Sequence, residues 1–114
     1  DQHTYLVEGP IDSLFLPNCL AVAGADMSDL GILDKDKTTL IFDNEPRNFQ
    51  IVRSMIKSLQ DGWKIMIWPN SITCKDINDM VLTSIKDARL VEIINRNTYS
   101  GQRGEWEVHS WKKV

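Results

Sequence analysis

The sequence contains few of the residues that build soft-metal sites or covalent cross-links. Among its 114 residues are only two cysteines and two histidines. Neither Cys19 nor Cys74 has a second cysteine or a histidine at the spacing of a zinc site. We therefore expect two reduced thiols inside a cytosolic fold, and no zinc in this chain.

Long apolar runs are also missing. No segment approaches the roughly 20 consecutive apolar residues of a membrane-spanning helix, and the first residues lack the basic and apolar parts of a signal peptide. We expect a soluble protein in the cytoplasm, with no membrane partner. The sequence starts without Met and enters a strand-like segment almost at once, as an excised piece of a longer protein would.

There is no excess of positive charge. Thirteen Lys and Arg residues stand against 16 Asp and Glu residues, and the net charge is -3. A domain that holds nucleic acid through bulk electrostatics would be basic, so any such binding must be local or assisted by metal. Carboxylates become complementary to phosphate once divalent cations have bound to them.

Apolar and β-branched runs predict strands at residues 4–8, 19–23, 37–43 and 63–68. The third run contains Thr38, Thr39, Leu40, Ile41 and Phe42. Such a near-continuous stretch is typical of a strand that is buried on both faces of a parallel sheet. We expect it to be a central strand.

Helical spacing appears between these runs. The clearest case is residues 46–61, which Gly62 would end. The apolar residues expected on its buried face are Phe49, Val52, Met55, Ile56 and Leu59. Shorter helices are predicted at residues 10–17 and 28–33, from residue 76 onward, and at 88–96, whereas residues 105–114 could be strand, helix or a docked tail.

Alternating strands and helices predict an α/β fold with a mainly parallel central sheet of about four strands, flanked by helices. No repeat or linker divides the sequence, so residues 1–114 are expected to form a single domain. In open sheets of this kind, functional residues gather at the carboxyl ends of the strands.

Acidic residues follow three of the predicted strands. The pairs are Glu8 with Asp12, Asp43 with Glu45, and Asp76 with Asp79. Carboxylates held close together repel unless one is protonated or a cation lies between them. All-oxygen ligation suits Mg²⁺ or Mn²⁺, so the pattern predicts a site for one of these ions. Each acid taken alone has a structural alternative, because Asp and Glu also stabilise helix N-termini.

Four tryptophans raise the question of base stacking. Trp63 and Trp68 flank a predicted buried strand, so we expect both in the core. Trp106 and Trp111 lie near basic residues of the tail and are better candidates for a DNA or protein contact. Docking into the core is nevertheless the favoured interpretation for these two as well.

Three segments carry a family resemblance. The runs V-E-G-P-I-D at 7–12, L-I-F-D-N-E at 40–45 and K-D-I-N-D at 75–79 resemble the signature motifs of the Toprim family, which includes primases, topoisomerases and certain nucleases. The match looks closer to the primases of T4-like tailed phages, and it covers roughly residues 5–81. It implies a Toprim-type fold and a fragment of a longer primase whose upstream zinc-binding module is absent.

The resemblance also implies roles for the acids. Glu8 matches a glutamate that acts in acid-base chemistry or helps to hold metal, and Asp43 and Glu45 match a metal-binding Asp-x-Asp pair. With Glu8, this pair would be catalytic. Glu45 departs from the motif, because its side chain is one methylene longer. Asp76 and Asp79 match a third acidic patch beside the metal.

Other positions would support the site. By resemblance, Gly9 permits a tight turn beside the glutamate, Asp12 is the acid that follows it, and Gly24 brings backbone close to the substrate. Arg47 and Lys75 lie next to the acidic motifs. We expect these two cations to contact nucleotide or template phosphates.

The implied function is that of a DNA primase, which uses Mg²⁺ or Mn²⁺ to join ribonucleoside triphosphates into short RNA primers on single-stranded DNA. A replicative helicase would be its partner, in the cytoplasm of the host cell. Two alternatives stay open. One is a Toprim nuclease that cleaves phosphodiesters with the same metals, and the other is a non-catalytic module that docks on a helicase.

Overall fold

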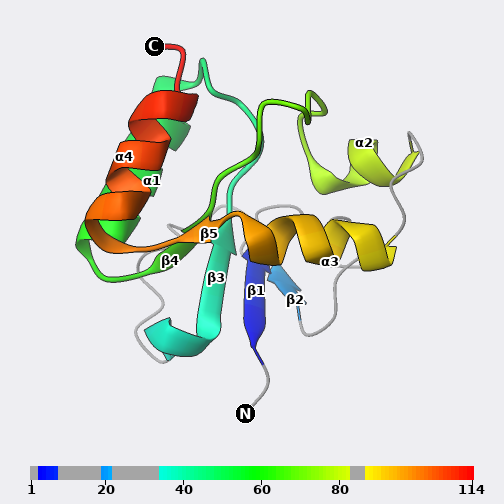
Figure 1. The fold of residues 1–114 in the computed structure, drawn as a ribbon, viewed down its shortest axis with the longest axis horizontal. Coiled ribbons are helices and arrows are strands. Elements are labelled where there is room, and N and C mark those ends of the chain that lie inside the picture. The colour runs from blue at the N-terminus through cyan, green and yellow to red at the C-terminus, as the bar shows by residue number, and fades with distance from the viewer. Residues whose placement is uncertain (1–2, 8–18, 22–33, 83–86) are drawn as a thin grey trace.

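The computed structural model describes residues 3–7, 19–21, 34–82 and 87–114. These residues form a five-stranded sheet in the order β2-β1-β3-β4-β5, with helices packed against it (Figure 1). The strands are β1 (Thr4–Val7), β2 (Cys19–Ala21), β3 (Thr38–Ile41), β4 (Lys64–Met66) and β5 (Thr98–Tyr99). The first four are parallel, and β5 runs antiparallel to β4. The predicted α/β fold with a mainly parallel sheet is confirmed, whereas β5 was not predicted.

The sheet separates two apolar cores. Leu6, Leu40 and Ile65 pack on one face with α1 (Phe49–Gln60) and α4 (Gly101–Trp111), which lie side by side in Figure 1. The next residue along each strand faces the other side, because side chains alternate along a strand. That second core includes residues of α2 (Ile77–Leu82) and α3 (Asp87–Arg96).

Strand β3 is central, as predicted. All four of its residues are buried, and it pairs with β1 on one side and β4 on the other. Its β-branched and apolar side chains fill both cores at once, which explains why the sequence shows no polar alternation here.

Helix α1 begins three residues later than predicted, after an N-cap at Asn48. Val52, Met55 and Leu59 are buried as expected, but Phe49 is 63% exposed and Ile51 is buried. Phe49 is the first helical residue, and its side chain tilts toward the helix N-terminus and away from the core.

Gly62 follows the C-cap of α1 with a φ of 94°. This left-handed conformation favours glycine, so the predicted stop signal is confirmed.

The last third of the chain resolves the open question about the tail. Helix α3 matches the prediction, and the tail forms α4. Elsewhere in the chain, a short 3-10 segment (Lys35–Lys37) precedes β3. Trp111 is buried, so the expected core docking is confirmed for this residue, but Trp106 is 62% exposed and the expectation was wrong there. Trp63 and Trp68 are both buried, as expected.

Several other expectations have partial outcomes. Cys19 and Cys74 are not joined by a disulfide. Within the described ranges, no helix has the length and apolar character that a bilayer crossing requires. The helices predicted at residues 10–17 and 28–33 lie outside the described residues.

Candidate functional site

The candidate site is a short segment that follows the central strand. We call residues 43–45, which are Asp43, Asn44 and Glu45, the acid loop. The Trp68 indole Nε1 donates to the Phe42 carbonyl oxygen at 2.9 Å, which fixes the chain just before the loop. The amide of Asn48 then donates to the Glu45 carbonyl oxygen at 3.0 Å and leads the chain into α1.

Asn44 ties the acid loop to the segment that follows β4. Its Nδ2 donates to the carbonyl oxygens of Ile72 and Cys74, at 2.9 and 3.0 Å, and its backbone amide donates to the Lys75 carbonyl oxygen at 2.5 Å. Its Oδ1 accepts a hydrogen bond of 3.1 Å from Trp111 Nε1 of α4. One side chain thus joins three segments that are distant in sequence.

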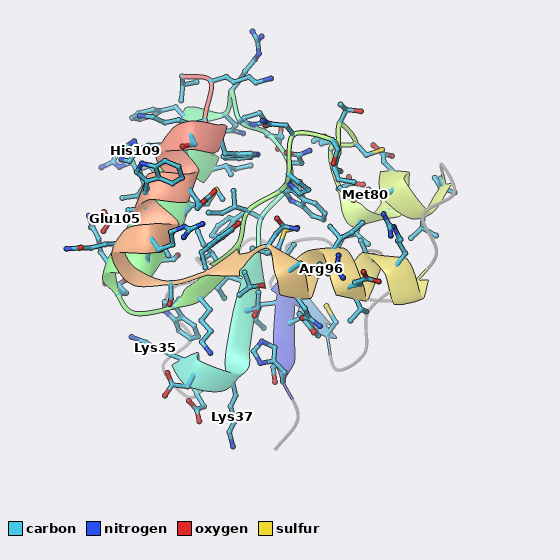
Figure 2. All side chains as sticks on the ribbon, viewed as in Figure 1. Lys35, Lys37, Met80, Arg96, Glu105 and His109 are labelled. Carbon is cyan, nitrogen blue, oxygen red and sulfur yellow. The ribbon has the colours of Figure 1, made fainter. Side chains whose placement is uncertain are left out.

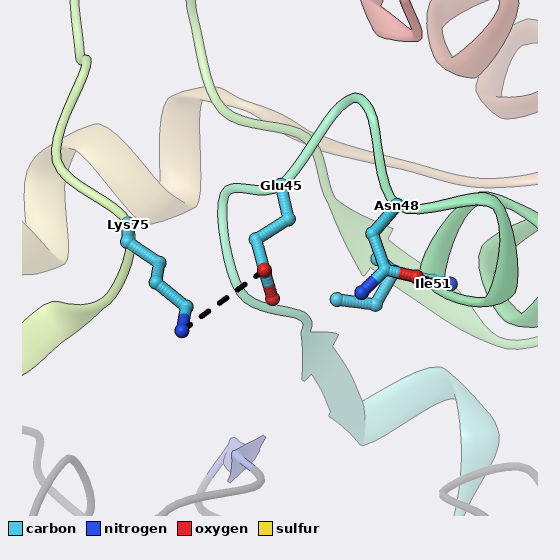
Figure 3. Close-up of polar contacts among 4 residues, drawn as sticks. All are labelled: Glu45, Asn48, Ile51 and Lys75. Carbon is cyan, nitrogen blue, oxygen red and sulfur yellow. Dashed lines mark hydrogen bonds and ion pairs between the residues drawn. The ribbon is translucent and has the colours of Figure 1, made fainter. Parts of the chain in front are cut away.

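Glu45 and Lys75 face each other across the two loops (Figure 3). Lys75 Nζ lies 4.0 Å from Glu45 Oε1, and the two side chains are 59% and 30% exposed. A pair this exposed contributes about 0–1 kcal/mol. The contact therefore places an exposed cation beside the carboxylate and adds little to the stability of the fold.

Asn48 closes the other end of the loop. Its Oδ1 accepts hydrogen bonds from the amides of Gln50 and Ile51, at 3.0 and 3.3 Å, and so caps α1. Figure 3 shows this side chain directed at the start of the helix, away from Lys75. The acid loop is thus held between a strand end and a capped helix start.

Asp76 has a structural partner. Its Oδ1 accepts a hydrogen bond of 2.9 Å from the backbone amide of Asp79, the third residue of α2. This is the geometry of an N-cap, in which the carboxylate satisfies a free helical amide. Whether Asp76 or Asp79 also ligates a metal stays a prediction.

Four other predicted site residues, Glu8, Gly9, Asp12 and Gly24, lie outside the described residues. In the part of the chain that the structure describes, no three His, Cys, Asp or Glu side chains come close enough to hold a metal ion. Asp43 and Glu45 supply hard oxygen ligands of the kind that Mg²⁺ prefers. A three-carboxylate site would need a further acid, and Glu8 is the predicted one.

The two predicted phosphate contacts differ in their surroundings. Lys75 pairs with Glu45, whereas Arg47 is an exposed residue between the acid loop and α1.

Trp106, the exposed tryptophan of α4, has Arg103 about 6.0 Å from its ring centroid. Arg53 and Lys57 are exposed on α1.

Asn44 and Trp111 are the positions whose role the sequence did not reveal. Asn44 stands between two acids at a strand end, and asparagine in such a place is a common turn residue. That signal indicates a turn only. Its bonds to Cys74 and Trp111 come from tertiary folding.

Comparisons with known proteins give one informative match. No protein-family model matches the chain. The sequence is 32% identical, over 117 aligned residues, to the DNA primase of Enterobacteria phage T4, and the alignment covers 100% of this chain and 34% of that protein. The chain thus spans about a third of the length of this relative. The similarity runs along the entire chain and supports a primase-like protein.

Proposed function

We propose that this chain is the Toprim catalytic domain of a phage-type DNA primase, which joins ribonucleotides into short RNA primers on single-stranded DNA. Similarity of the whole chain to a phage DNA primase supports this proposal. The structural observation that carries it is the position of Asp43 and Glu45. Both lie at the carboxyl end of the central parallel strand, where ligands bind in sheets of this type.

In this proposal Asp43 and Glu45 hold Mg²⁺ or Mn²⁺ together with Glu8, and Asp76 and Asp79 complete the acidic surroundings. The oxygen ligands of the acid loop suit these ions better than zinc. A divalent ion bound there would neutralise triphosphate charge and favour in-line displacement of pyrophosphate.

The residues of the chain would do the positioning. Asn44 fixes the backbone between the two acids through its bonds to Ile72 and Cys74. The weak contact between Lys75 and Glu45 exchanges easily. Lys75 would therefore pair with a triphosphate oxygen once a cation neutralises Glu45, and the exposed Arg47 would do the same from the start of α1.

The activity, substrates and partners belong to a longer protein in this proposal. The substrates are ribonucleoside triphosphates and a single-stranded DNA template, and the partner is a replicative helicase. An upstream zinc-binding module would help to choose the initiation site. We expect the isolated chain to be weakly active or inactive.

The test is primer synthesis by the full-length protein that contains this chain, with single-stranded DNA, ribonucleoside triphosphates and Mg²⁺. Asp43→Asn and Glu45→Gln should each lower the rate by about 100-fold, because each removes a charged oxygen ligand. Asp61→Asn is the matched control, since Asp61 is an exposed acid at the far end of α1. It should leave the rate unchanged.

Two results would overturn the proposal. One is full primer synthesis by both acid-loop variants. The other is Mg²⁺-dependent cleavage of nucleic acid without nucleotides, together with no primer synthesis, which would indicate a nuclease instead.

A further inference from the structure

A polar pocket opens at the opposite edge of the sheet from the acid loop. It is lined by His3, Tyr5, Thr39, Lys64, Asn95, Thr98, Tyr99 and Ser100 and has a volume of about 550 Å³. These residues lie at the amino-terminal ends of β1, β3 and β4, at the end of α3 and along β5. Figure 2 shows Lys35 and Lys37 near this end of the sheet, far from Met80 of α2.

The strand register explains why polar groups meet here. Tyr5 pairs with Thr39, and Thr39 pairs with Lys64, so the three side chains form a row across the sheet. They point to the α3 face, because the next residues, Leu6, Leu40 and Ile65, fill the α1 face.

The charge of the pocket is opposite to that of the chain. The protein has a net charge of -3, yet the described lining includes a lysine and a histidine and no Asp or Glu. Lys64 Nζ donates to the backbone carbonyl oxygen of Asp36 at 2.9 Å. A neutral carbonyl holds the ammonium in place without cancelling its charge, and two of its three hydrogens stay available.

Other hydrogen-bond donors surround this cation. Tyr5 donates its hydroxyl to Asn95 Oδ1 at 2.8 Å, which leaves the Asn95 amide hydrogens as donors. Ser100 precedes α4, but its side chain makes no capping hydrogen bond. His3 Nε2 lies 2.6 Å from Thr39 Oγ1. The lining thus combines one fixed positive charge with several neutral donors.

We propose that this pocket binds the phosphate group of a small phosphorylated molecule, with Lys64 as the charged contact and Asn95 and Ser100 as neutral donors. A tetrahedral oxyanion accepts several hydrogen bonds at once and gains most from a charged donor. The volume is that of a small-molecule site, so there is room for more than a bare ion. The site is separate from the acid loop and does not depend on the proposed primase activity.

The binding test uses calorimetric titration in EDTA, which prevents any phosphate binding through divalent metal at the acid loop. The probes are inorganic phosphate, pyrophosphate and a ribonucleoside monophosphate, with acetate as the carboxylate control. Saturable binding of at least one phosphate probe at millimolar concentration, and none of acetate, is expected. The probe with the tightest binding identifies the source of the phosphate group.

Variants then assign the binding to the pocket. Lys64→Gln should weaken binding by about tenfold or more, and Lys64→Arg should retain it. Lys57→Gln is the matched control, because Lys57 is an exposed lysine on α1 outside the pocket. Equal affinity of the two glutamine variants, or no saturable binding of any phosphate probe to the folded protein, would overturn the proposal.

If Lys64→Gln fails to fold, the phosphate-dependent shift of the His3 ring in NMR spectra of the unaltered protein decides the matter. A saturable shift supports the pocket, and an unchanged spectrum contradicts it.

Discussion

Asn44 matters more to the candidate site than its place between two acids suggests. Replacing it with Asp keeps the shape but removes the amide donors to the carbonyls of Ile72 and Cys74. It also brings a negative charge against those carbonyls. We expect Asn44→Asp to lower the free energy of unfolding by about 1–3 kcal/mol, because two part-buried acceptors lose their donor.

Urea denaturation measures this loss directly. Asn70→Asp is the matched control, since Asn70 is an exposed residue of the loop that follows β4. If both variants unfold at the same urea concentration, Asn44 does not brace the acid loop.

His3 gives a second prediction about a single residue. Burial lowers the pKa of His3 below its ordinary value of 6.5, and the nearby Lys64 lowers it further. Below pH 6.5 the unfolded chain takes up a proton that folded His3 does not bind. The contribution of His3 to the free energy of unfolding is therefore complete above pH 6.5. It declines as the pH falls toward the pKa of His3 in the folded state.

An NMR titration of the His3 ring tests this explanation. Lys64→Met should raise the His3 pKa part of the way back, because burial, the larger cause, remains. Lys57→Met should leave it unchanged. A His3 pKa at or above 6.5 in the unaltered protein would contradict the assignment.

The close contact of α1 and α4 gives a prediction about whole elements. A Cβ built at Gly104 would overlap the Cδ2 methyl of Leu59, which is itself buried. We expect Gly104→Ala to destabilise the protein by about 1–3 kcal/mol through overpacking. Alanine has a higher helix propensity than glycine, which offsets about 1 kcal/mol of this destabilisation.

A double-mutant cycle separates the overlap from other effects. Leu59→Ala alone should cost about 2–5 kcal/mol, and the double variant should cost less than the sum of the two single changes. Gln102→Ala, at an exposed position of α4, is the control. Strict additivity would mean that the two residues do not compete for space.

Most elements could be predicted because their sequence patterns are strong. Strand β3 has a continuous apolar run, and α1 has regular spacing with Gly62 after it. Helix α4 could not be predicted, because Gly101 and Gly104 weaken the helical signal. It packs closely on α1, because Gly104 has no Cβ to overlap Leu59. Strand β5 has only two residues and exists through its pairing with β4.

The candidate site was predictable in part for a similar reason. Asp43 and Glu45 follow a recognisable strand, so their place at the carboxyl end of β3 could be predicted from the sequence. Their metal-binding role stays a prediction. The contacts that hold them come from residues far along the chain, such as the indole of Trp111 on Asn44. No local pattern encodes such a contact.

At the scale of the whole molecule, the parallel sheet separates two chemically different edges. The acid loop and Lys75 lie where the strands end. Where they begin lies a pocket whose described lining includes Lys64 and no Asp or Glu. Parallel strands produce this division because all their carboxyl ends meet at one edge. The proposed metal chemistry belongs to the first edge and phosphate binding without metal to the second.

The central claim is that folding brings Asp43, Glu45 and Glu8 together around a divalent cation. Anomalous diffraction from crystals soaked in Mn²⁺ tests this claim most directly. We predict an anomalous peak that contacts carboxylate oxygens of the acid loop and of Glu8, and that is lost in Asp43→Asn crystals. No peak at millimolar Mn²⁺, or a peak that touches none of these three carboxylates, would contradict it.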